Sequence, residues 1–241
     1  MFEQAIGLKK KYRDGERILG VSMPPDTEPD RFEAVLDADA YDFVSIDSQH
    51  TPLSEERIVA FCAMAEARDV FVQFRIKHTR HAYLIGNYLD LGPCGVEVPQ
   101  TELEETADEA VRFFYYPPQG GRSYGGRARR GAEGRDPVAY AAWWNTYGVL
   151  WLQMESVEAV TRAHILVRPG VDCLSFGPTD LSFSLQAHPN HWLKTVDDCI
   201  GYVCRSLEGT GVAVCHRNGS PDTREKYADM GVQVFLEGPQ V

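Results

Sequence analysis

Eight short apolar segments recur along this chain of 241 residues, and stretches with helical character separate most of them. Near-continuous runs of Val, Ile and Phe are typical of parallel strands that are covered on both faces. Eight such strands alternating with helices predict an α/β fold, a single (β/α)8 TIM barrel spanning residues 1–241, with a doubly wound open sheet as the alternative. The even spacing and the count of eight favour the barrel. The predicted strands are Ile18–Met23, Phe43–Asp47, Val70–Arg75, Gly95–Pro99, Val149–Glu155, Cys173–Pro178, Gly211–Arg217 and Val232–Glu237.

Helical character is clearest in three of the intervening segments, Ser54–Arg68, Thr101–Val111 and Asp197–Leu207. The chain ends at Val241, a few residues after the eighth predicted strand. The barrel is therefore predicted to lack its last helix or to have it truncated. We expect either an N-terminal helix around Phe2–Arg13 or a neighbouring subunit to cover the outer face of that strand.

The charge balance excludes two classes of partner. The formal net charge is −11, from 35 acidic and 24 basic residues. Nucleic acid and anionic lipid both attract proteins with the opposite balance, so we expect neither a nucleic acid nor a membrane as partner. No apolar run approaches the ~20 residues that span a bilayer, and the first residues lack a signal-peptide pattern. These features predict a cytoplasmic protein.

A Gly/Arg-rich segment, at about residues 117–136, interrupts the regular alternation. Between Gln119 and Arg135 it holds five arginines and six glycines. It has neither the Lys-Ser/Thr pair of a P-loop nor the glycine spacing of a dinucleotide-binding turn. A long mobile loop over the barrel mouth is the favoured interpretation, in which some of the arginines could still meet an anion.

Polar side chains stand at the ends of four predicted strands, where a parallel barrel carries its catalytic groups. The second strand runs into Asp47-Ser48-Gln49-His50, the third ends at Arg75, the fifth ends in Gln153-Met154-Glu155, and the sixth runs into Gly177-Pro178-Thr179-Asp180. Polar groups at the ends of apolar strands cost free energy unless they have partners. Four such ends on one rim predict a functional site.

Glu155 and Asp180 are the predicted metal ligands. Two carboxylates with few nitrogen or sulfur neighbours suit a hard divalent cation that takes its other oxygens from water and substrate. Either carboxylate alone is more often a cap or a salt-bridge partner, and Asp180 could cap a helix that starts near Leu181. The pairing across adjacent strands favours the metal site. A sulfur-rich zinc site is not expected, because no Cys/His cluster has the required spacing.

His50 and Arg75 complete the predicted site. Histidine is a common proton shuttle in enzymes, and His50 follows Asp47 by three residues, so that carboxylate can orient it or share its proton. Arg75 offers a fixed cation for a carboxylate or an enolate oxygen, and a salt bridge within the barrel is an equally weighted alternative. Only Lys77 of the lysines lies near a strand end, so enolate chemistry here would need a metal rather than a Schiff base.

Four segments together resemble the HpcH/HpaI family of class II pyruvate aldolases, and the resemblance extends from Ile18 to about Gly231. They are Asp42–His50 (DFVSIDSQH), Tyr116–Arg122 (YPPQGGR), Leu152–Glu155 (LQME) and Gly177–Ser182 (GPTDLS). The resemblance implies a metal-dependent lyase that cleaves or forms 4-hydroxy-2-oxo acids from an aldehyde and pyruvate or a similar 2-oxo acid. It also implies a homo-oligomer, a trimer or a hexamer.

The resemblance implies a role for each site residue. Glu155 and Asp180 hold Mg²⁺ or Mn²⁺, with Co²⁺ or Zn²⁺ as alternatives, and the backbone from Gly177 through Pro178 and Thr179 to Asp180 binds the substrate carboxylate. Arg75 stabilises the enolate oxygen, and Gln153 positions the substrate.

His50, with Asp47 and Asp90, forms the implied acid/base group. In this chain Gln49 stands where the family usually has Glu, which removes a charge beside His50.

Two other readings stay open from the sequence. A related metal-enolate lyase could act on a CoA thioester, whose phosphates the Arg-rich loop could reach, or decarboxylate oxaloacetate. Alternatively, a barrel without catalytic activity could bind ligands or serve as an assembly subunit.

Overall fold

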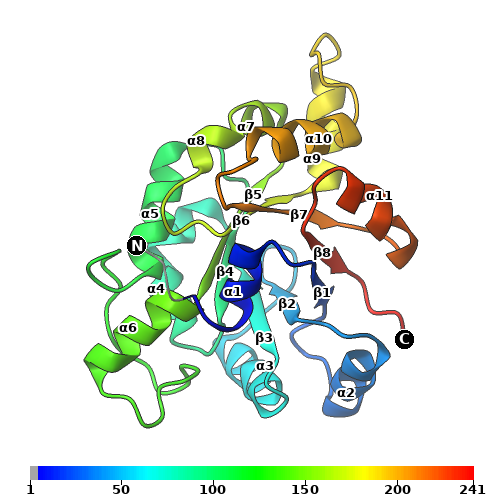
Figure 1. Cartoon of the computed structure of the whole chain (residues 1–241). Coiled ribbons are helices and arrows are strands. Elements are labelled where there is room, and N and C mark those ends of the chain that lie inside the picture. The colour runs from blue at the N-terminus through cyan, green and yellow to red at the C-terminus, as the bar shows by residue number, and fades with distance from the viewer. Residues whose placement is uncertain (1–4) are drawn as a thin grey trace.

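The computed structural model describes residues 5–241, so Met1 to Gln4, with the start of the predicted N-terminal helix, lie outside the described part (Figure 1). Eight parallel strands pair in chain order, and β8 pairs with β1 to close a barrel. This confirms the predicted barrel and excludes the open sheet. The strands are β1 Ile18–Ser22, β2 Phe43–Asp47, β3 Phe71–Arg75, β4 Gly95–Val98, β5 Val149–Met154, β6 Cys173–Phe176, β7 Ala213–Arg217 and β8 Val234–Glu237.

Helices and short 3-10 segments connect the strands and surround the barrel in Figure 1. They are α1 Gly7–Asp14, α2 Pro29–Ala38, α3 Glu55–Ala67, η1 Thr79–Leu84, α4 Ile85–Leu89, α5 Glu104–Phe114, α6 Pro137–Tyr147, α7 Val157–Thr161, α8 Ala163–Leu166, α9 Pro178–Ala187, α10 Val196–Ser206, η2 Pro221–Thr223 and α11 Arg224–Asp229. No helix within residues 5–241 is both long enough and apolar enough to cross a bilayer.

The barrel interior has an apolar half and a polar half. We call the end at which the strands begin the base and the end at which they finish the mouth. Inward-facing residues near the base form one apolar cluster, which includes Phe43, Trp151 and Val234. Further along β2 to β6 the inward side chains become polar, as in Gln73 and Gln153. On these five strands the lumen therefore changes from an apolar core at the base to polar side chains toward the mouth.

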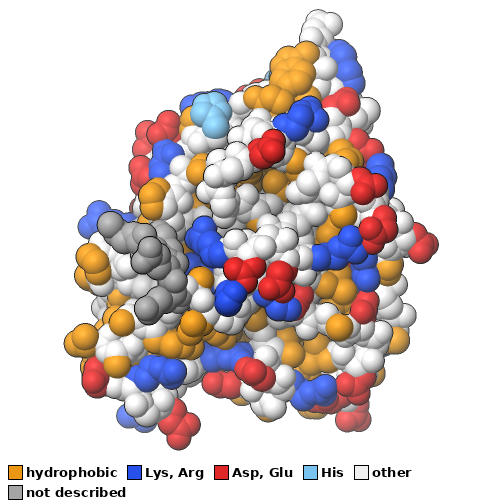
Figure 2. Space-filling view, in the orientation of Figure 1, with side chains coloured by type: hydrophobic (Ala, Val, Ile, Leu, Met, Phe, Trp, Pro, Cys, Tyr) orange, Lys and Arg blue, Asp and Glu red, His pale blue; other side chains and the backbone are white. Residues whose placement is uncertain are grey.

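Helix α1 closes the base of the barrel. Its Leu8 and Tyr12 pack into the apolar cluster of the lumen, and α1 lies across the centre of the barrel in Figure 1. Charged side chains of both signs gather near the centre of the same face in Figure 2. Of the two alternatives for covering the outer face of β8, the N-terminal helix is therefore wrong. Its buried apolar residues, Leu8 and Tyr12, pack against the apolar lumen at the base instead.

A buried ion pair holds α1 in place. Lys9 is fully buried and donates to a carboxylate oxygen of Asp172 at 3.0 Å, to the carbonyl of Gly148 and to the hydroxyl of Tyr115. The Asp172 carboxylate also accepts from the guanidinium of Arg13 and from a backbone N–H of β5. Both charges are thus compensated without water, as a buried pair requires.

The Gly/Arg-rich segment lies beside the base, which corrects its predicted place over the mouth. Helix α5 returns the chain from the end of β4 to the base, and the segment follows α5 there. Arg130 donates to the carbonyl of Val70 and pairs with Asp69, and both residues precede β3. The direction of the chain explains the correction, since the chain that leaves a strand at the mouth must return to the base before the next parallel strand begins.

Aromatic rings hold three arginines of this segment. Arg122 lies over the rings of Tyr116 and Trp144, Arg129 over Tyr124 and Tyr140, and Arg135 over Trp143. Stacking on aromatic faces stabilises a guanidinium group where few carboxylates are available.

Candidate active site

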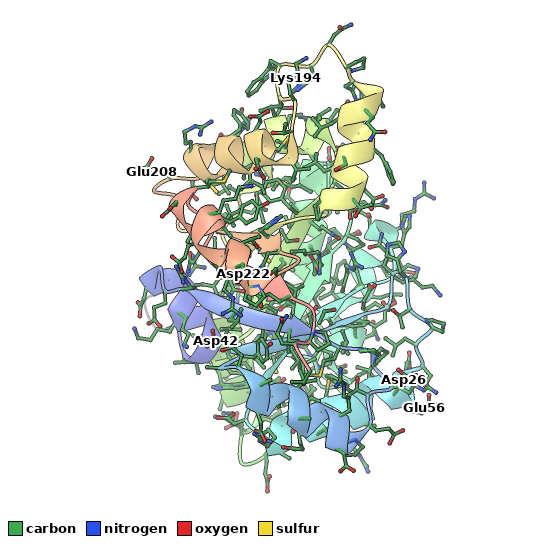
Figure 3. The ribbon with its side chains drawn as sticks, turned by 90° about the vertical axis from the view of Figure 1, so that its right-hand side faces the viewer. Asp26, Asp42, Glu56, Lys194, Glu208 and Asp222 are labelled. Atoms are coloured by element: carbon green, nitrogen blue, oxygen red, sulfur yellow. The ribbon has the colours of Figure 1, made fainter. Side chains whose placement is uncertain are left out.

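The mouth and the base lie on opposite sides of the molecule in Figure 3. Asp42, before β2, and Glu208, after α10, lie on the side of the base. Asp26, after β1, and Glu56, at the start of α3, lie on the other side. The ends of the second, third, fifth and sixth strands share the side of Asp26 and Glu56, because all eight strands are parallel.

Arg75 and Asp47 form a two-pronged ion pair at the mouth. Their strands are neighbours, and the register places the two residues directly opposite one another. Nε and Nη2 of Arg75 donate to the two carboxylate oxygens of Asp47 at 2.8 and 2.7 Å, and Nη1 donates to Gln153 at 3.3 Å. Burial acts to raise the pKa of Asp47, but the hydrogen bond and charge of Arg75 outweigh it and leave that pKa below its usual value. The three hydrogen bonds to Asp47 and Gln153 fix the position of the Arg75 guanidinium.

His50 is exposed in the loop after β2. The Asp47 carboxylate accepts the backbone N–H groups of Gln49 and His50, at 2.8 and 3.4 Å. The structure thus joins Asp47 to the loop backbone and to Arg75, and the contact with His50 runs through its main chain.

Glu155 is buried directly after β5 and carries an unsatisfied oxygen, Oε2. Gly177, the N-cap of α9, lies beside it, and a Cβ at that position would stand 2.2 Å from Glu155 Oε1. Asp180 lies in the first turn of α9. Burial, followed by the like charge of Asp180, raises the pKa of Glu155 to about 7. The fold thus holds two carboxylates close together and leaves one of them without a partner.

A cavity of about 560 Å³ adjoins this carboxylate pair. Glu155 and Asp180 lie on its wall, together with polar residues of the loops after β3 and β4. One of these is Gln100, which takes a positive φ of 47°, a backbone conformation that side chains of this kind adopt infrequently. The volume accommodates a small organic acid.

Three further polar residues inside the barrel, Glu97, Ser175 and Arg217, are not among those predicted from the sequence. Glu97 on β4 is fully buried and accepts from the hydroxyl of Ser175 on β6 and from Nη2 of Arg217 on β7, each at 2.5 Å. The sequence carries a signal for two of these residues, because Glu97 and Arg217 are charged residues within apolar strands.

Asp90 lies apart from the other predicted site residues. It caps the C-terminal end of α4, which returns the chain from the mouth to the base, and it pairs with Arg122 at 2.8 Å. Burial raises the pKa of Asp90 against the opposing effect of Arg122. Within one chain, Asp90 is therefore remote from the mouth. The other predicted residues lie at the mouth, at the ends of strands or directly after them: Asp47, Arg75, Gln153, Glu155, Gly177, Pro178, Thr179 and Asp180.

The carboxylate pair fits a divalent cation. The buried oxygen of Glu155 lacks a hydrogen-bond donor, and its repulsion from Asp180 would be relieved by a positive charge between them. Within residues 5–241 no cluster of three or more His, Cys, Asp or Glu side chains could hold a metal. A hard ion bound by two carboxylates keeps positions for water or substrate oxygens.

Comparison with known proteins identifies the family of this chain. The family model "HpcH/HpaI aldolase/citrate lyase" matches residues 29–214. The pyruvate aldolase of Rhizobium etli is 31% identical over 199 residues, which are 80% of this chain and 76% of that protein. The hydroxypyruvate/pyruvate aldolase of Roseovarius nubinhibens is 26% identical over 86% of this chain and 80% of that protein.

A solved structure extends the agreement to the whole fold. The HpcH/HpaI aldolase of Desulfitobacterium hafniense superposes with a TM-score of 0.84 at 28% identity, covering 97% of this chain and 91% of that one. The chain described here belongs to the HpcH/HpaI aldolase/citrate lyase family and is an aldolase of that family.

Proposed function

We propose that this aldolase is metal-dependent and that it cleaves or forms 4-hydroxy-2-oxo acids from an aldehyde and pyruvate or a close 2-oxo acid. The observation that carries the proposal is the buried carboxylate of Glu155 beside the half-buried Asp180, with one unsatisfied carboxylate oxygen next to a cavity. The names of the relatives, which are pyruvate and hydroxypyruvate aldolases, support the 2-oxo acid.

Glu155 and Asp180 would hold Mg²⁺, Mn²⁺ or a similar divalent ion. When bound, that ion supplies Lewis-acid stabilisation of negative charge on the substrate's 2-oxo oxygen. The backbone of the first turn of α9, around Thr179 and Asp180, binds the substrate carboxylate, because N–H groups are free at a helix N-terminus.

Arg75 donates to the enolate oxygen that develops when the C3–C4 bond breaks. Asp47 fixes the guanidinium through two hydrogen bonds, so little reorganisation is needed when charge appears. Gln153 accepts from Arg75 and has its own amide nitrogen without a partner, which leaves that nitrogen available to the substrate.

His50 removes the proton of the 4-hydroxyl in cleavage and returns a proton to C3 of the enolate. Asp47 contributes by positioning the loop that carries His50. Asp90 lies toward the base of its own barrel, so a role for Asp90 at His50 requires a second copy of the chain. We therefore propose a homo-oligomer.

The CoA-thioester alternative is less favoured, since the Gly/Arg-rich segment lies beside the base, where Arg122 and Arg129 are buried against aromatic rings and Arg130 is bound to Val70 and Asp69. Decarboxylation of oxaloacetate would use the same enolate site and remains a second reaction to assay.

The test is an assay of retro-aldol cleavage of a 4-hydroxy-2-oxo acid, in which the released pyruvate is measured. EDTA should abolish activity, Mg²⁺ or Mn²⁺ should restore it, and borohydride with pyruvate should leave it unchanged. Glu102→Gln, which alters another acid on the same cavity wall, is the matched control for Glu155→Gln. Full activity in EDTA would overturn the proposal.

A further inference from the structure

A buried carboxylate that the proposed reaction does not use lies in the lumen below the mouth. Glu97 on β4 is completely buried, and the register places it directly opposite Arg75 on β3. Gly95, two residues earlier on β4, faces the lumen, because a Cβ there would stand 2.0 Å from Oε1 of the inward-facing Gln73. Side chains alternate along a strand, so Glu97 faces the lumen as well.

Glu97 makes its hydrogen bonds across the lumen. Its carboxylate accepts from the hydroxyl of Ser175 on β6 and from Nη2 of Arg217 at the end of β7, each at 2.5 Å. Strands β4 and β7 are not neighbours in the barrel, so the contact with Arg217 spans the interior. The side chain of Arg217 is 22% exposed and that of Glu97 is fully buried. The ion pair therefore leads from the closed lumen to the solvent at the mouth.

Four charged side chains near the mouth form two ion pairs. Asp47 neutralises Arg75, and Glu97 neutralises Arg217. Each arginine thus has its own counter-charge from within the barrel. The carboxylate pair of the proposed metal site consequently keeps its negative charge for a divalent cation, although two guanidinium groups lie near it.

Both members of the Glu97–Arg217 ion pair lie near that metal site. The register of β5, β6 and β7, continued past the last paired residues, places Glu155, Gly177 and Arg217 at one level. Gly177 has no side chain, so nothing from β6 separates the other two. After burial and the like charge of its neighbour in the carboxylate pair, the charge of Glu97 also raises the pKa of Glu155 and that of Arg217 lowers it.

A role in folding alone explains this ion pair poorly. Apolar side chains fill the lumen at the base, and replacing a buried ion pair by apolar residues of similar volume is often neutral or stabilising. A charge pair beside the proposed metal site is better explained by its electrostatic effect on the ion.

We propose that Glu97 sets the affinity of the site for its divalent cation by neutralising Arg217. Without the carboxylate of Glu97, the guanidinium would repel a cation held by Glu155. Neither partner of this ion pair is a metal ligand, and both act on the ion through space, so the effect depends on their charges and not on contact. This inference rests on the proposed function.

Single and double changes of charge in the pair test the assignment without turnover. The dissociation constant of Mn²⁺ is measured calorimetrically at pH 8, above the pKa of about 7 of Glu155, so that a proton on this carboxylate contributes little. Glu97→Gln should weaken Mn²⁺ binding about tenfold, because it leaves a positive charge uncompensated near the ion. Arg217→Gln should not weaken it.

The double variant Glu97→Gln/Arg217→Gln separates charge from structural damage. It has a neutral pair in the same place, so Mn²⁺ affinity should return to within about twofold of that of the unaltered protein. A distortion of the barrel caused by Glu97→Gln would not be repaired by a second substitution that removes its partner.

Glu237→Gln is the matched control. Glu237 is also buried at the end of a strand and pairs with an arginine, Arg224. It faces away from the lumen, because the preceding Leu236 belongs to the apolar cluster inside the barrel. The control removes the same charge from a similar ion pair on the outer face, and Mn²⁺ affinity should not change.

Unchanged Mn²⁺ affinity in Glu97→Gln, a loss that the double variant fails to reverse, or weaker binding in Arg217→Gln would overturn the role of Glu97. Binding of Mn²⁺ by the unaltered protein would still support the proposed function in each of these cases. Absence of Mn²⁺ binding by the unaltered protein would overturn the proposed function, and this inference with it.

Discussion

The two ends of the barrel differ in the hydrogen-bond partners that they give to a buried carboxylate. At the base, Asp172 accepts hydrogen bonds from Lys9, Arg13 and a backbone N–H, and the network is closed. At the mouth, Glu155 is buried beside Asp180 with one oxygen unsatisfied.

The contrast separates stability from function within one fold. Where a buried charge has all its partners in place, removal of one partner destabilises the folded state, because the remaining charge is then buried without compensation. A buried charge without a partner is tolerated where a ligand completes it. The base network thus holds α1 against the barrel, whereas the unsatisfied carboxylate at the mouth is where we propose that a cation and an anionic substrate bind.

The largest expected effect is on catalysis at the mouth. Glu155→Gln should lower kcat/KM for retro-aldol cleavage about a thousandfold, because loss of a single group that stabilises developing charge costs about 4 kcal/mol. Steady-state kinetics with Mn²⁺ check this, with Glu102→Gln as the control. A loss below tenfold contradicts the assignment.

The next effect is on stability at the base. Asp172→Ala should lower the free energy of unfolding by about 3–5 kcal/mol, since it leaves Lys9 buried without its counter-ion. Chemical denaturation measures the change. If the protein loses less than about 1 kcal/mol, the base network does not have the role described here.

The pH dependence of stability should differ between the two ends. Without metal, Glu155 has a pKa near 7, above its value in an unfolded chain, so the folded state binds the extra proton. The contribution of this proton to the free energy of unfolding is present at low pH and is lost as the pH rises through about 7. Metal-free Glu155→Gln should therefore exceed the unaltered protein in stability at pH 8, by about 1–3 kcal/mol, with little difference at pH 5. Unfolding curves at both pH values decide it, and a variant that is less stable at pH 8 argues against an unsatisfied carboxylate.

The smallest expected effect comes from the remote aspartate. Asp90→Asn keeps the size of the side chain and weakens its pair with Arg122, whose guanidinium also rests on aromatic rings, so stability should fall by about 1 kcal/mol. A retro-aldol assay of Asp90→Asn at several protein concentrations distinguishes this loss of stability from a catalytic role of Asp90. Loss of activity that exceeds the loss of folded protein would show that Asp90 reaches a site, and a second copy would have to supply it.

The strands and the mouth could be predicted because they depend on local pattern and on one rule. Apolar runs located all eight strands to within two residues at either end, and the rule that parallel strands finish together gathered Asp47, Arg75, Gln153, Glu155 and Asp180.

The errors arose where position depends on contacts between distant segments. Nothing local showed that Leu8 and Tyr12 of α1 would fill the lumen instead of covering β8. The Gly/Arg-rich segment and Asp90 could have been placed at the base by following the chain, since both stand at or after the end of a helix that returns from the mouth. The pair Glu97 and Arg217 required the register across the barrel.

Binding of Mn²⁺ to the folded protein tests the central claim most directly. We predict one Mn²⁺ per chain, lost in Glu155→Gln and in Asp180→Asn, and retained in Glu102→Gln, whose altered side chain lies on the same cavity wall. Unchanged Mn²⁺ affinity in the first two variants would contradict the proposed metal site, because Glu155 and Asp180 would then have no cation to hold.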